Sequence, residues 1–315
     1  MLQTLASLSS AHTFAGATWT QRGPDGLLQL DIKTEQCEAR LFPHGGHVAT
    51  WTPLLPGPGA PRPALHLSPK SAFDRKKAIR GGVPVCFPWF GPRENDPRPD
   101  GKPSPAHGFA RTALWQVESV TLETNGRVRV EMTLASNAET KAVWDADFEA
   151  TLIASVGHTL QVSLEVRNTG DREIEYEEAL HTYLEVGDVQ TVQLIGLEGT
   201  SYLDKVDGGQ RKQNGREPLM LRDETDSVFH GTKSAVTVVD PVLGRHLKIE
   251  KTGSMSTVVW NPWLVKAQAM PDVGGESWRS FVCVEAANTG PHKVVLPVGA
   301  VHATSTRVTV LPQTR

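Results

Sequence analysis

Apolar and polar residues alternate along several short segments of the chain. At residues 128–134 and again at residues 160–167, every second residue is Val, Leu or Met and the residues between them are polar. This period of two places successive side chains on opposite faces of a sheet, so one face is buried and the other is wet, as in antiparallel sheets. Shorter runs rich in β-branched residues predict further strands at residues 235–239, 247–250, 257–260, 281–285 and 307–311.

Turn-forming residues separate these runs. The segments at residues 156–158 and 168–171 are typical of hairpin connections. No convincing amphipathic helix longer than about ten residues is present, although helices usually hold about a third of the residues of a globular protein. The pattern therefore predicts an all-β protein, and such folds can exceed ~200 residues as a single domain. Periodicity alone does not distinguish a sandwich from a barrel.

Composition narrows the function classes. Of the 315 residues, 39% are hydrophobic and 21% are charged, which favours a packed core over disorder. The net charge of −3 argues against nucleic acid as the main ligand, because proteins that bind it usually carry a basic excess. The N-terminal segment lacks the pattern of a signal peptide, and no apolar run is long enough to span a membrane. We therefore expect a cytoplasmic protein with neither a membrane nor a nucleic-acid partner.

The three cysteines, Cys37, Cys86 and Cys283, are odd in number and widely spaced. A disulfide framework and a Cys-x-x-Cys metal site are both disfavoured by that spacing, and free buried thiols in a reducing compartment are expected. The histidines of the sequence PHGGH at residues 43–47 do not have the spacing of a recognised metal site, so a loop near the surface is favoured there. Two Pro-rich stretches, at residues 53–63 and 91–105, are expected to be surface loops.

Two arginines stand out as candidate anion ligands. Arg80 is the single charged residue in AIRGGVPVCFPWFG at residues 78–91, and a charge embedded in this way needs a partner of opposite sign. That partner is either an anionic ligand or a structural carboxylate. Arg111 closes the sequence HGFAR at residues 107–111. Two planar guanidinium groups that converge on one phosphate would form a sensible binding site.

Two further residues are candidates for acid–base chemistry. His181 lies in EEALHTYLEV, where a strand would place its side chain on one face with Tyr183, opposite the core. An accessible imidazole can exchange protons near neutral pH, although a lone histidine is more often structural. Glu285 lies at the end of the apolar run FVCVE, so it is either salt-bridged or a tuned base in a pocket. Trp260 and Trp263 in VVWNPW form either an aromatic wall for a sugar or part of the core.

Taken together, these segments resemble one family. The resemblance rests on six sequences that occur in this order: IRGGVPVCFPWFGP, HGFAR, ALHTYLEV, ETDSVF, VVWNPW and FVCVEAAN. They are similar to the hexose-6-phosphate mutarotases (glucose-6-phosphate 1-epimerases) of the galactose-mutarotase-like superfamily, over roughly residues 25 to 312. The resemblance implies an N-terminal extension at residues 1–24 and a single large antiparallel β-sandwich, the supersandwich of that superfamily, at residues 25–315.

The resemblance also implies roles. His181 would be the general acid and Glu285 the general base in the ring opening of a sugar phosphate. The substrate-binding residues that it implies are Arg80, Arg111, His107 and Asp226, with phosphate as the target of the two arginines and sugar hydroxyls as the target of the aspartate. Asp204, in the sequence TSYLDK, lies in another family-like segment. The resemblance implies a monomer that uses no cofactor or metal.

One departure from the family pattern concerns substrate preference. The family often has Gln directly before HGFAR, and this chain has Ala106 there.

Three alternative functions stay open: an aldose 1-epimerase acting on unphosphorylated sugars, a glycosidase, and a non-catalytic carbohydrate-binding sandwich. Paired carboxylates would suit a glycosidase better than a histidine paired with a glutamate.

Overall fold

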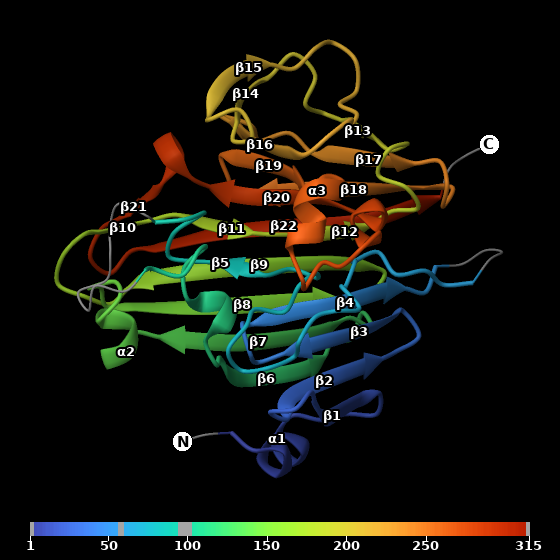
Figure 1. Ribbon diagram of the computed structural model, residues 1–315. Helices are drawn as coiled ribbons and strands as arrows, with labels where there is room; N and C mark the ends of the chain where they lie inside the picture. The colour runs from blue at the N-terminus through green and yellow to red at the C-terminus, as the bar shows by residue number, and fades with distance from the viewer. Residues whose placement is uncertain (1–2, 56–59, 94–102, 313–315) are drawn as a thin grey trace.

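The computed structural model describes residues 3–55, 60–93 and 103–312. Antiparallel strands make up most of the regular secondary structure, and they form two large sheets, a smaller N-terminal sheet and a two-stranded ribbon (Figure 1). Parts of the two Pro-rich stretches, at residues 56–59 and 94–102, lie outside the described residues.

One large sheet, here called the front sheet, has the strand order β15-β14-β16-β19-β20-β11-β5, with β12 also paired to β20. Its strands are β5 (Val85–Cys86), β11 (Glu178–Leu180), β12 (Tyr183–Glu185), β14 (Ser201–Asp204), β15 (Gln210–Gln213), β16 (Thr225–His230), β19 (Ser256–Asn261) and β20 (Phe281–Asn288). Every residue of β19 and β20 is buried. The centre of the front sheet is therefore covered on both faces, which explains why its sequence is apolar without clear alternation.

The second large sheet, the rear sheet, has the order β13-β17-β18-β22-β9-β8-β7-β6. Its strands are β6 (Gln116–Leu122), β7 (Val128–Ala135), β8 (Phe148–Val156), β9 (Thr159–Asn168), β13 (Gln193–Ile195), β17 (Val236–Asp240), β18 (Arg245–Thr252) and β22 (Val301–Pro312). Buried residues alternate with partly exposed ones along β7 and β8. The alternation in the sequence therefore correctly predicted strands with one buried face.

Of the two predicted hairpin turns, one is confirmed and one is wrong. β8 and β9 pair directly across residues 156–158. After residue 168, however, the chain continues to β10 (Ile174–Tyr176), which pairs with β21 (Val294–Leu296) and not with β9. The reason is local: the side-chain amide of Asn168 donates to the carbonyl oxygens of Arg172 and Leu296, at 2.7 and 2.9 Å. These bonds direct the chain away from the rear sheet.

The N-terminal sheet has the order β1-β2-β3-β4 and follows a short helix. Its elements are α1 (Leu5–Ala11), β1 (Ala17–Arg22), β2 (Leu27–Lys33), β3 (Cys37–Phe42) and β4 (His47–Pro53). Trp51 of β4 donates from its indole N–H to the carbonyl oxygen of Gly157, at 3.0 Å, so this sheet is tied to the rear sheet. The domain boundary predicted between residues 24 and 25 falls in the turn between β1 and β2, and it stays a prediction.

Helices are few and short in the described part of the chain. They are α2 (Ala138–Lys141), α3 (Trp263–Ala269) and the 3-10 turns η1 (Ala110–Thr112), η2 (Ser277–Ser280) and η3 (Gly290–His292), besides α1. Within the ranges that the structure describes, none of the helices has the length and apolar character needed to cross a membrane. The predicted absence of long amphipathic helices is confirmed for these residues.

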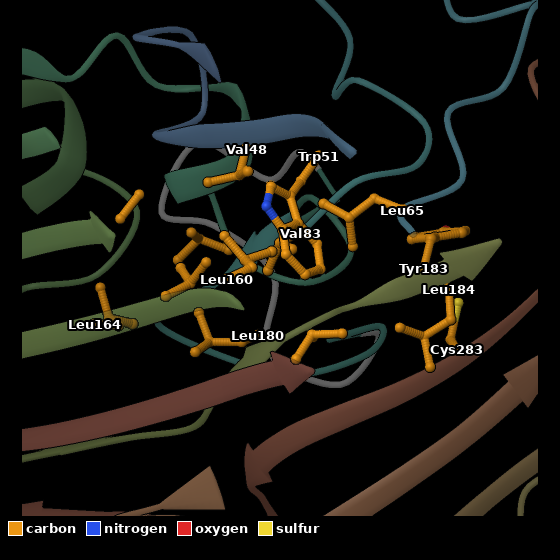
Figure 2. Packing of buried hydrophobic residues seen from close by; sticks show 14 of the residues in the cluster. Val48, Trp51, Leu65, Val83, Leu160, Leu164, Leu180, Tyr183, Leu184 and Cys283 are labelled. Atoms are coloured by element: carbon orange, nitrogen blue, oxygen red, sulfur yellow. The ribbon is translucent and has the colours of Figure 1, made fainter. Parts of the chain in front are cut away.

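One hydrophobic core joins the three sheets. Figure 2 shows Trp51 of β4, Leu160 of β9 and Leu180 of β11 side by side, and all three belong to one cluster of fully buried residues. Because side chains from the front, rear and N-terminal sheets share this cluster, the molecule is a sandwich closed around a common core. The prediction of an all-β antiparallel sandwich is confirmed.

Candidate active site

The acid–base candidates meet on the front sheet. Glu285 lies on β20 and is 1% exposed, and His181 lies in the short break between β11 and β12 and is 7% exposed. His181 Nε2 is 3.3 Å from Glu285 Oε1. The approach is close enough for an ion pair but lacks the geometry of a hydrogen bond, since neither carboxyl oxygen has a hydrogen-bond partner among the described residues. Buried polar atoms that lack partners are costly and are characteristic of functional sites.

The break between β11 and β12 determines where the imidazole points. The sequence suggested one strand over residues 177–186, but the backbone N–H of His181 donates to the carbonyl oxygen of Pro84 instead of continuing the ladder to β20. The ring of His181 stacks on that of Tyr183, with centroids 4.8 Å apart and planes 11° apart. The expectation that these two side chains share a face is therefore confirmed, and stacking fixes the imidazole in front of Glu285.

Burial shifts the pKa values of the pair in opposite directions. Loss of solvent, reinforced by the charge of Asp226, raises the pKa of Glu285 well above its ordinary value. Loss of solvent, reinforced by His107, Arg80 and Arg111, lowers the pKa of His181 well below its ordinary value. Both shifts favour a neutral carboxyl group beside a neutral imidazole. The pair then holds one proton that can lie on either residue.

The raised pKa of Glu285 predicts a pH-dependent stability. In the folded protein the carboxyl group keeps its proton above the unfolded value of about 4.3, so the folded state binds more protons and stability falls as pH rises, by up to about 1.4 kcal/mol per pH unit. Glu285→Gln carries no titrating group, so its melting temperature should exceed that of the wild type at pH 7–8 and converge with it near pH 4. Thermal unfolding across this range provides the measurement. A difference in melting temperature that does not vary with pH would contradict the raised pKa of Glu285.

Two further rings surround the imidazole. Trp260 of β19 meets His181 edge to face at a centroid distance of 5.7 Å, and His107 meets it at 5.9 Å. Trp260 is buried and also packs against Tyr183. Trp263, the second tryptophan of VVWNPW, instead packs on Trp278 at 4.6 Å. Of the two tryptophans considered for an aromatic wall, only Trp260 contacts the acid–base pair.

Arg80 is held by Asp272 and Tyr183, neither of which the sequence identified as a partner of this arginine. Its Nε and one terminal nitrogen each lie 2.9 Å from Asp272 Oδ2, and its other terminal nitrogen donates to the Tyr183 hydroxyl at 2.9 Å. The structural carboxylate considered as an alternative partner therefore exists. Burial lowers the pKa of Arg80, but Tyr183 and Asp272 outweigh it and raise the pKa. Since a guanidinium group has five N–H donors and three are used here, two are left for an anion.

The glycines after Arg80 serve packing between strands. A Cβ atom at Gly82, where φ is +64°, would lie 2.2 Å from the carbonyl oxygen of Val48, and one at Gly81 would lie 2.4 Å from that of His66. Adjacent glycines allow the backbone to approach a neighbouring group closely. In the structure they let it approach neighbouring strands, which fixes the position from which the Arg80 side chain extends.

Arg111 lies in η1 and is half-buried, and its guanidinium group interacts electrostatically with that of Arg80. One terminal nitrogen donates to the carbonyl oxygen of Ala106 at 2.6 Å, and no carboxylate pairs with Arg111 among the described residues. Burial, opposed by Cys86 and reinforced by Arg80, lowers the pKa of Arg111. A guanidinium group without a countercharge is better placed than Arg80 to receive an anionic ligand. Ala106, the departure from the family pattern, contributes its backbone carbonyl to orient Arg111.

His107 is the remaining candidate from HGFAR. Its Nδ1 accepts a hydrogen bond from the backbone N–H of Gly91 at 3.3 Å. Burial, together with Arg111, Lys205 and Arg80, lowers the pKa of His107 to about 3. The ring is therefore neutral, and because Nδ1 accepts, Nε2 carries the proton. His107 can thus donate a hydrogen bond but cannot supply a positive charge.

Asp226 and Lys205 complete the site on the side of β14 and β16. Burial, opposed mainly by the charges of Lys205 and Lys266, raises the pKa of Asp226. The ammonium group of Lys205 lies 5.0 Å from the centre of the Phe90 ring, and its charge acts on Asp226, His107 and Glu285. Lys205 was missed in the sequence, although it directly follows Asp204 in TSYLDK. The loop that returns from β14 brings it to the site.

Other candidates lie elsewhere or have structural partners. The carboxylate of Asp204 pairs with Lys212 at 2.7 Å. His44 and His47 are buried, not in a surface loop as expected, and His44 Nε2 lies 2.9 Å from the carbonyl oxygen of Lys77. Across the described ranges, no group of three or more His, Cys, Asp or Glu side chains could hold a metal ion. The three cysteines are free and buried, as expected.

The comparisons with known proteins agree with this fold. The crystal structure of a "putative mutarotase" from Salmonella typhimurium superposes with a TM-score of 0.85 at 26% identity, covering 96% of each chain. A galactose mutarotase related enzyme from Lactobacillus acidophilus superposes with a TM-score of 0.70 at 15% identity, covering 91% of this chain and 98% of the other. The class defined by the fold is therefore the galactose mutarotase-like sandwiches.

Sequence similarity places the chain within that class. A sequence model of the Aldose 1-epimerase family matches residues 28–309, and the chain belongs to that family. Two relatives, from Cenchrus ciliaris and Escherichia coli strain K12, are each named "Putative glucose-6-phosphate 1-epimerase" and are 32% identical to this chain. The first alignment covers 84% of this chain and 79% of the relative, and the second covers 85% of each.

Proposed function

We propose that this protein is an isomerase that interconverts the α and β anomers of a hexose 6-phosphate, with glucose 6-phosphate as the substrate. The observation that carries the proposal is the buried pair of His181 and Glu285 with unpartnered polar atoms, next to two guanidinium groups. The family's own description supplies the reaction class, and the names of the two relatives supply the phosphorylated substrate.

Anomer exchange needs one proton removed and one delivered. Glu285 takes the proton of the C1 hydroxyl while His181 protonates the ring oxygen, and the bond between C1 and the ring oxygen breaks to give the open-chain aldehyde. The C1–C2 bond then rotates. Ring closure on the other face reverses both transfers, so His181 and Glu285 end as they began. Each acid–base partner typically contributes about 10²–10⁴-fold to the rate.

The substrate prepares the pair for this role. Burial favours a protonated Glu285 beside a neutral His181. A bound phosphate favours the imidazolium form of His181, and sugar hydroxyls that donate to Glu285 favour its carboxylate. The proton count of the pair is unchanged, because one proton only moves from the carboxyl group to the imidazole across the 3.3 Å separation.

Arg80 and Arg111 bind the phosphate in this proposal, and Lys205 adds a third positive charge. Asp226 accepts hydrogen bonds from sugar hydroxyls, and His107 donates one from Nε2. Charge supports the assignment, since Arg80, Arg111 and Lys205 all act on the His107 ring. No negative charge in the described residues pairs with Arg111.

The test is the anomerisation of freshly dissolved α-glucose 6-phosphate, coupled to a dehydrogenase specific for the β anomer, beside the same assay with glucose. Fast conversion of the phosphate alone supports the proposal. Equal conversion of both sugars identifies an aldose 1-epimerase for free sugars, which the pairing of Arg80 with Asp272 favours. Binding without conversion identifies a carbohydrate-binding protein.

We further propose that the chain acts as a monomer in the cytoplasm, without a nucleic-acid partner. Three free buried thiols and a net charge of −3 support these assignments. Light scattering after size-exclusion chromatography measures the oligomeric state, and a dimer mass would contradict the first of them.

A further inference from the structure

A second cluster of reactive side chains lines a separate cavity of about 650 Å³. The cavity walls come from residues 63–70, from Glu185 of β12 and from the loop and turn at residues 273–280. None of the residues assigned above to anomer exchange lines it. His66 on its wall stacks on Phe281 at a centroid distance of 5.0 Å, and Phe281 in turn contacts Tyr183. The cavity is therefore a neighbour of the sugar site and distinct from it.

Three side chains on this wall form a chain of close polar contacts. Ser277 Oγ lies 3.3 Å from His66 Nε2, and His66 Nδ1 lies 2.6 Å from Glu185 Oε2. A carboxylate can only accept a hydrogen bond, so Nδ1 carries the proton and Nε2 has a free lone pair directed at the serine hydroxyl. A hydroxyl, a base and a carboxylate that orients the base are the parts of an activated nucleophile.

The contacts of Ser277 argue against a purely structural role. The contact with His66 is the only hydrogen bond of its hydroxyl within the described residues. If His66 were purely structural, Glu185 would satisfy one ring nitrogen and solvent the other. The contact with Ser277 would then not be needed. The ring of His66 is buried, with 7% of its side chain exposed, whereas Ser277 is only half-buried at the cavity wall. The base is thus held rigidly while the hydroxyl stays accessible.

The rest of the wall can stabilise negative charge. Gly274 and Gly275 line the cavity beside Ser277, with φ of +74° and +36°. A backbone N–H group that has no protein acceptor can donate a hydrogen bond to a developing oxyanion. Within the described residues, neither Gly275 nor Glu276 donates its backbone N–H to a protein acceptor. Lys70 lies over this turn, since its Nζ would be 3.1 Å from a Cβ atom at Gly274.

We propose that Ser277 is the nucleophile of a second active site that hydrolyses small carboxylic esters, with His66 as its base and Glu185 as the residue that positions His66. Ser277 Oγ attacks the ester carbonyl carbon while its proton passes to His66 Nε2. The C–O bond to the alcohol breaks, and the leaving oxygen takes that proton. Water then gives a proton to Nε2 and attacks the acyl group, the bond to Oγ breaks, and the proton returns to Ser277 as the carboxylic acid leaves.

The first experiment measures hydrolysis of p-nitrophenyl acetate by the full-length protein and its variants. Ser277→Ala should lower the protein-dependent rate by about 100-fold or more, because it removes the nucleophile. Ser280→Ala, which removes a hydroxyl from the same cavity wall, should leave the rate unchanged. A rate that survives in Ser277→Ala would overturn the proposal.

A second measurement does not depend on the folding of any variant. A fluorophosphonate probe should label the wild-type protein, and mass spectrometry of its peptides should place the label on Ser277. Absence of label, or a label confined to other residues, overturns the proposal. Glu185→Gln tests positioning: kcat for ester hydrolysis should fall while KM changes little, and Glu185→Asp, which keeps a carboxylate, should recover part of the rate. Equal loss of rate in Glu185→Gln and Glu185→Asp would contradict the role of Glu185.

Discussion

Glu285→Gln should lower the rate of anomer exchange by about 10²–10⁴-fold while leaving the affinity for glucose 6-phosphate within a few fold of the wild type. Gln has nearly the same shape as Glu and can still accept a hydrogen bond from the C1 hydroxyl. It cannot take the proton, however, so ring opening loses its base. Because Glu285 is 1% exposed, bulk water cannot easily replace the carboxylate.

The measurement combines the coupled anomerisation assay with calorimetric binding of glucose 6-phosphate. Glu250→Gln on β18 of the rear sheet is the matched control, since it makes the same chemical change away from the site and should keep wild-type turnover. Near-wild-type turnover in Glu285→Gln would refute the role of the base. Loss of turnover together with loss of binding would instead indicate that Glu285 serves substrate affinity.

The fold was predictable because its signal is local. Alternation of apolar and polar residues at 128–134 and 160–167 follows from burial of one face, and the structure has β7 and β9 there. The turn after residue 168 was not predictable, because two side-chain hydrogen bonds of Asn168 decide it, and one of them reaches Leu296. The turn-forming residues at 168–171 do not reveal that Asn168 will bond to a residue so far along the chain.

The site was predictable to the extent that its residues lie in unusual local sequences. Glu285 at the end of an apolar run and Arg80 alone among apolar residues violate the usual rules of burial, and such violations mark functional or strained positions. The structure brings both to the neighbourhood of His181. Their roles stay predictions, since position alone does not show proton transfer or phosphate binding.

The residues that the sequence did not indicate come to their sites through contacts between distant segments of the chain. Asp272 is an ordinary carboxylate in a loop until the fold places it against Arg80. Lys205 is an exposed lysine that the turn after β14 brings near Phe90. The contact between His66 and Ser277 spans 211 positions of the chain. No local composition distinguishes these residues, so only the three-dimensional arrangement assigns them to a site.

Arg111→Ala should raise KM for glucose 6-phosphate by about 10-fold to 100-fold and change KM for glucose very little. A hydrogen bond to a charged group contributes about 1.5–3 kcal/mol, and about 1.4 kcal/mol corresponds to a tenfold change in affinity. Arg111 has no countercharge among the described residues, so its removal leaves no unpaired carboxylate in the protein. The free energy lost is therefore that of binding the phosphate. Arg111→Lys keeps the charge but not the paired donors. Its KM for glucose 6-phosphate should therefore lie between that of the wild type and that of Arg111→Ala.

Kinetics of wild type, Arg111→Ala and Arg111→Lys with both sugars provide the measurement, and Arg172→Ala is the control. Arg172 pairs with Asp145 at the protein surface, so its loss should affect neither KM. The contrast between phosphorylated and free sugar separates phosphate recognition from general damage, because a distorted site would weaken both substrates. Equal effects on glucose 6-phosphate and glucose would refute the phosphate role of Arg111, and Arg80 and Lys205 would then have to bind the phosphate alone.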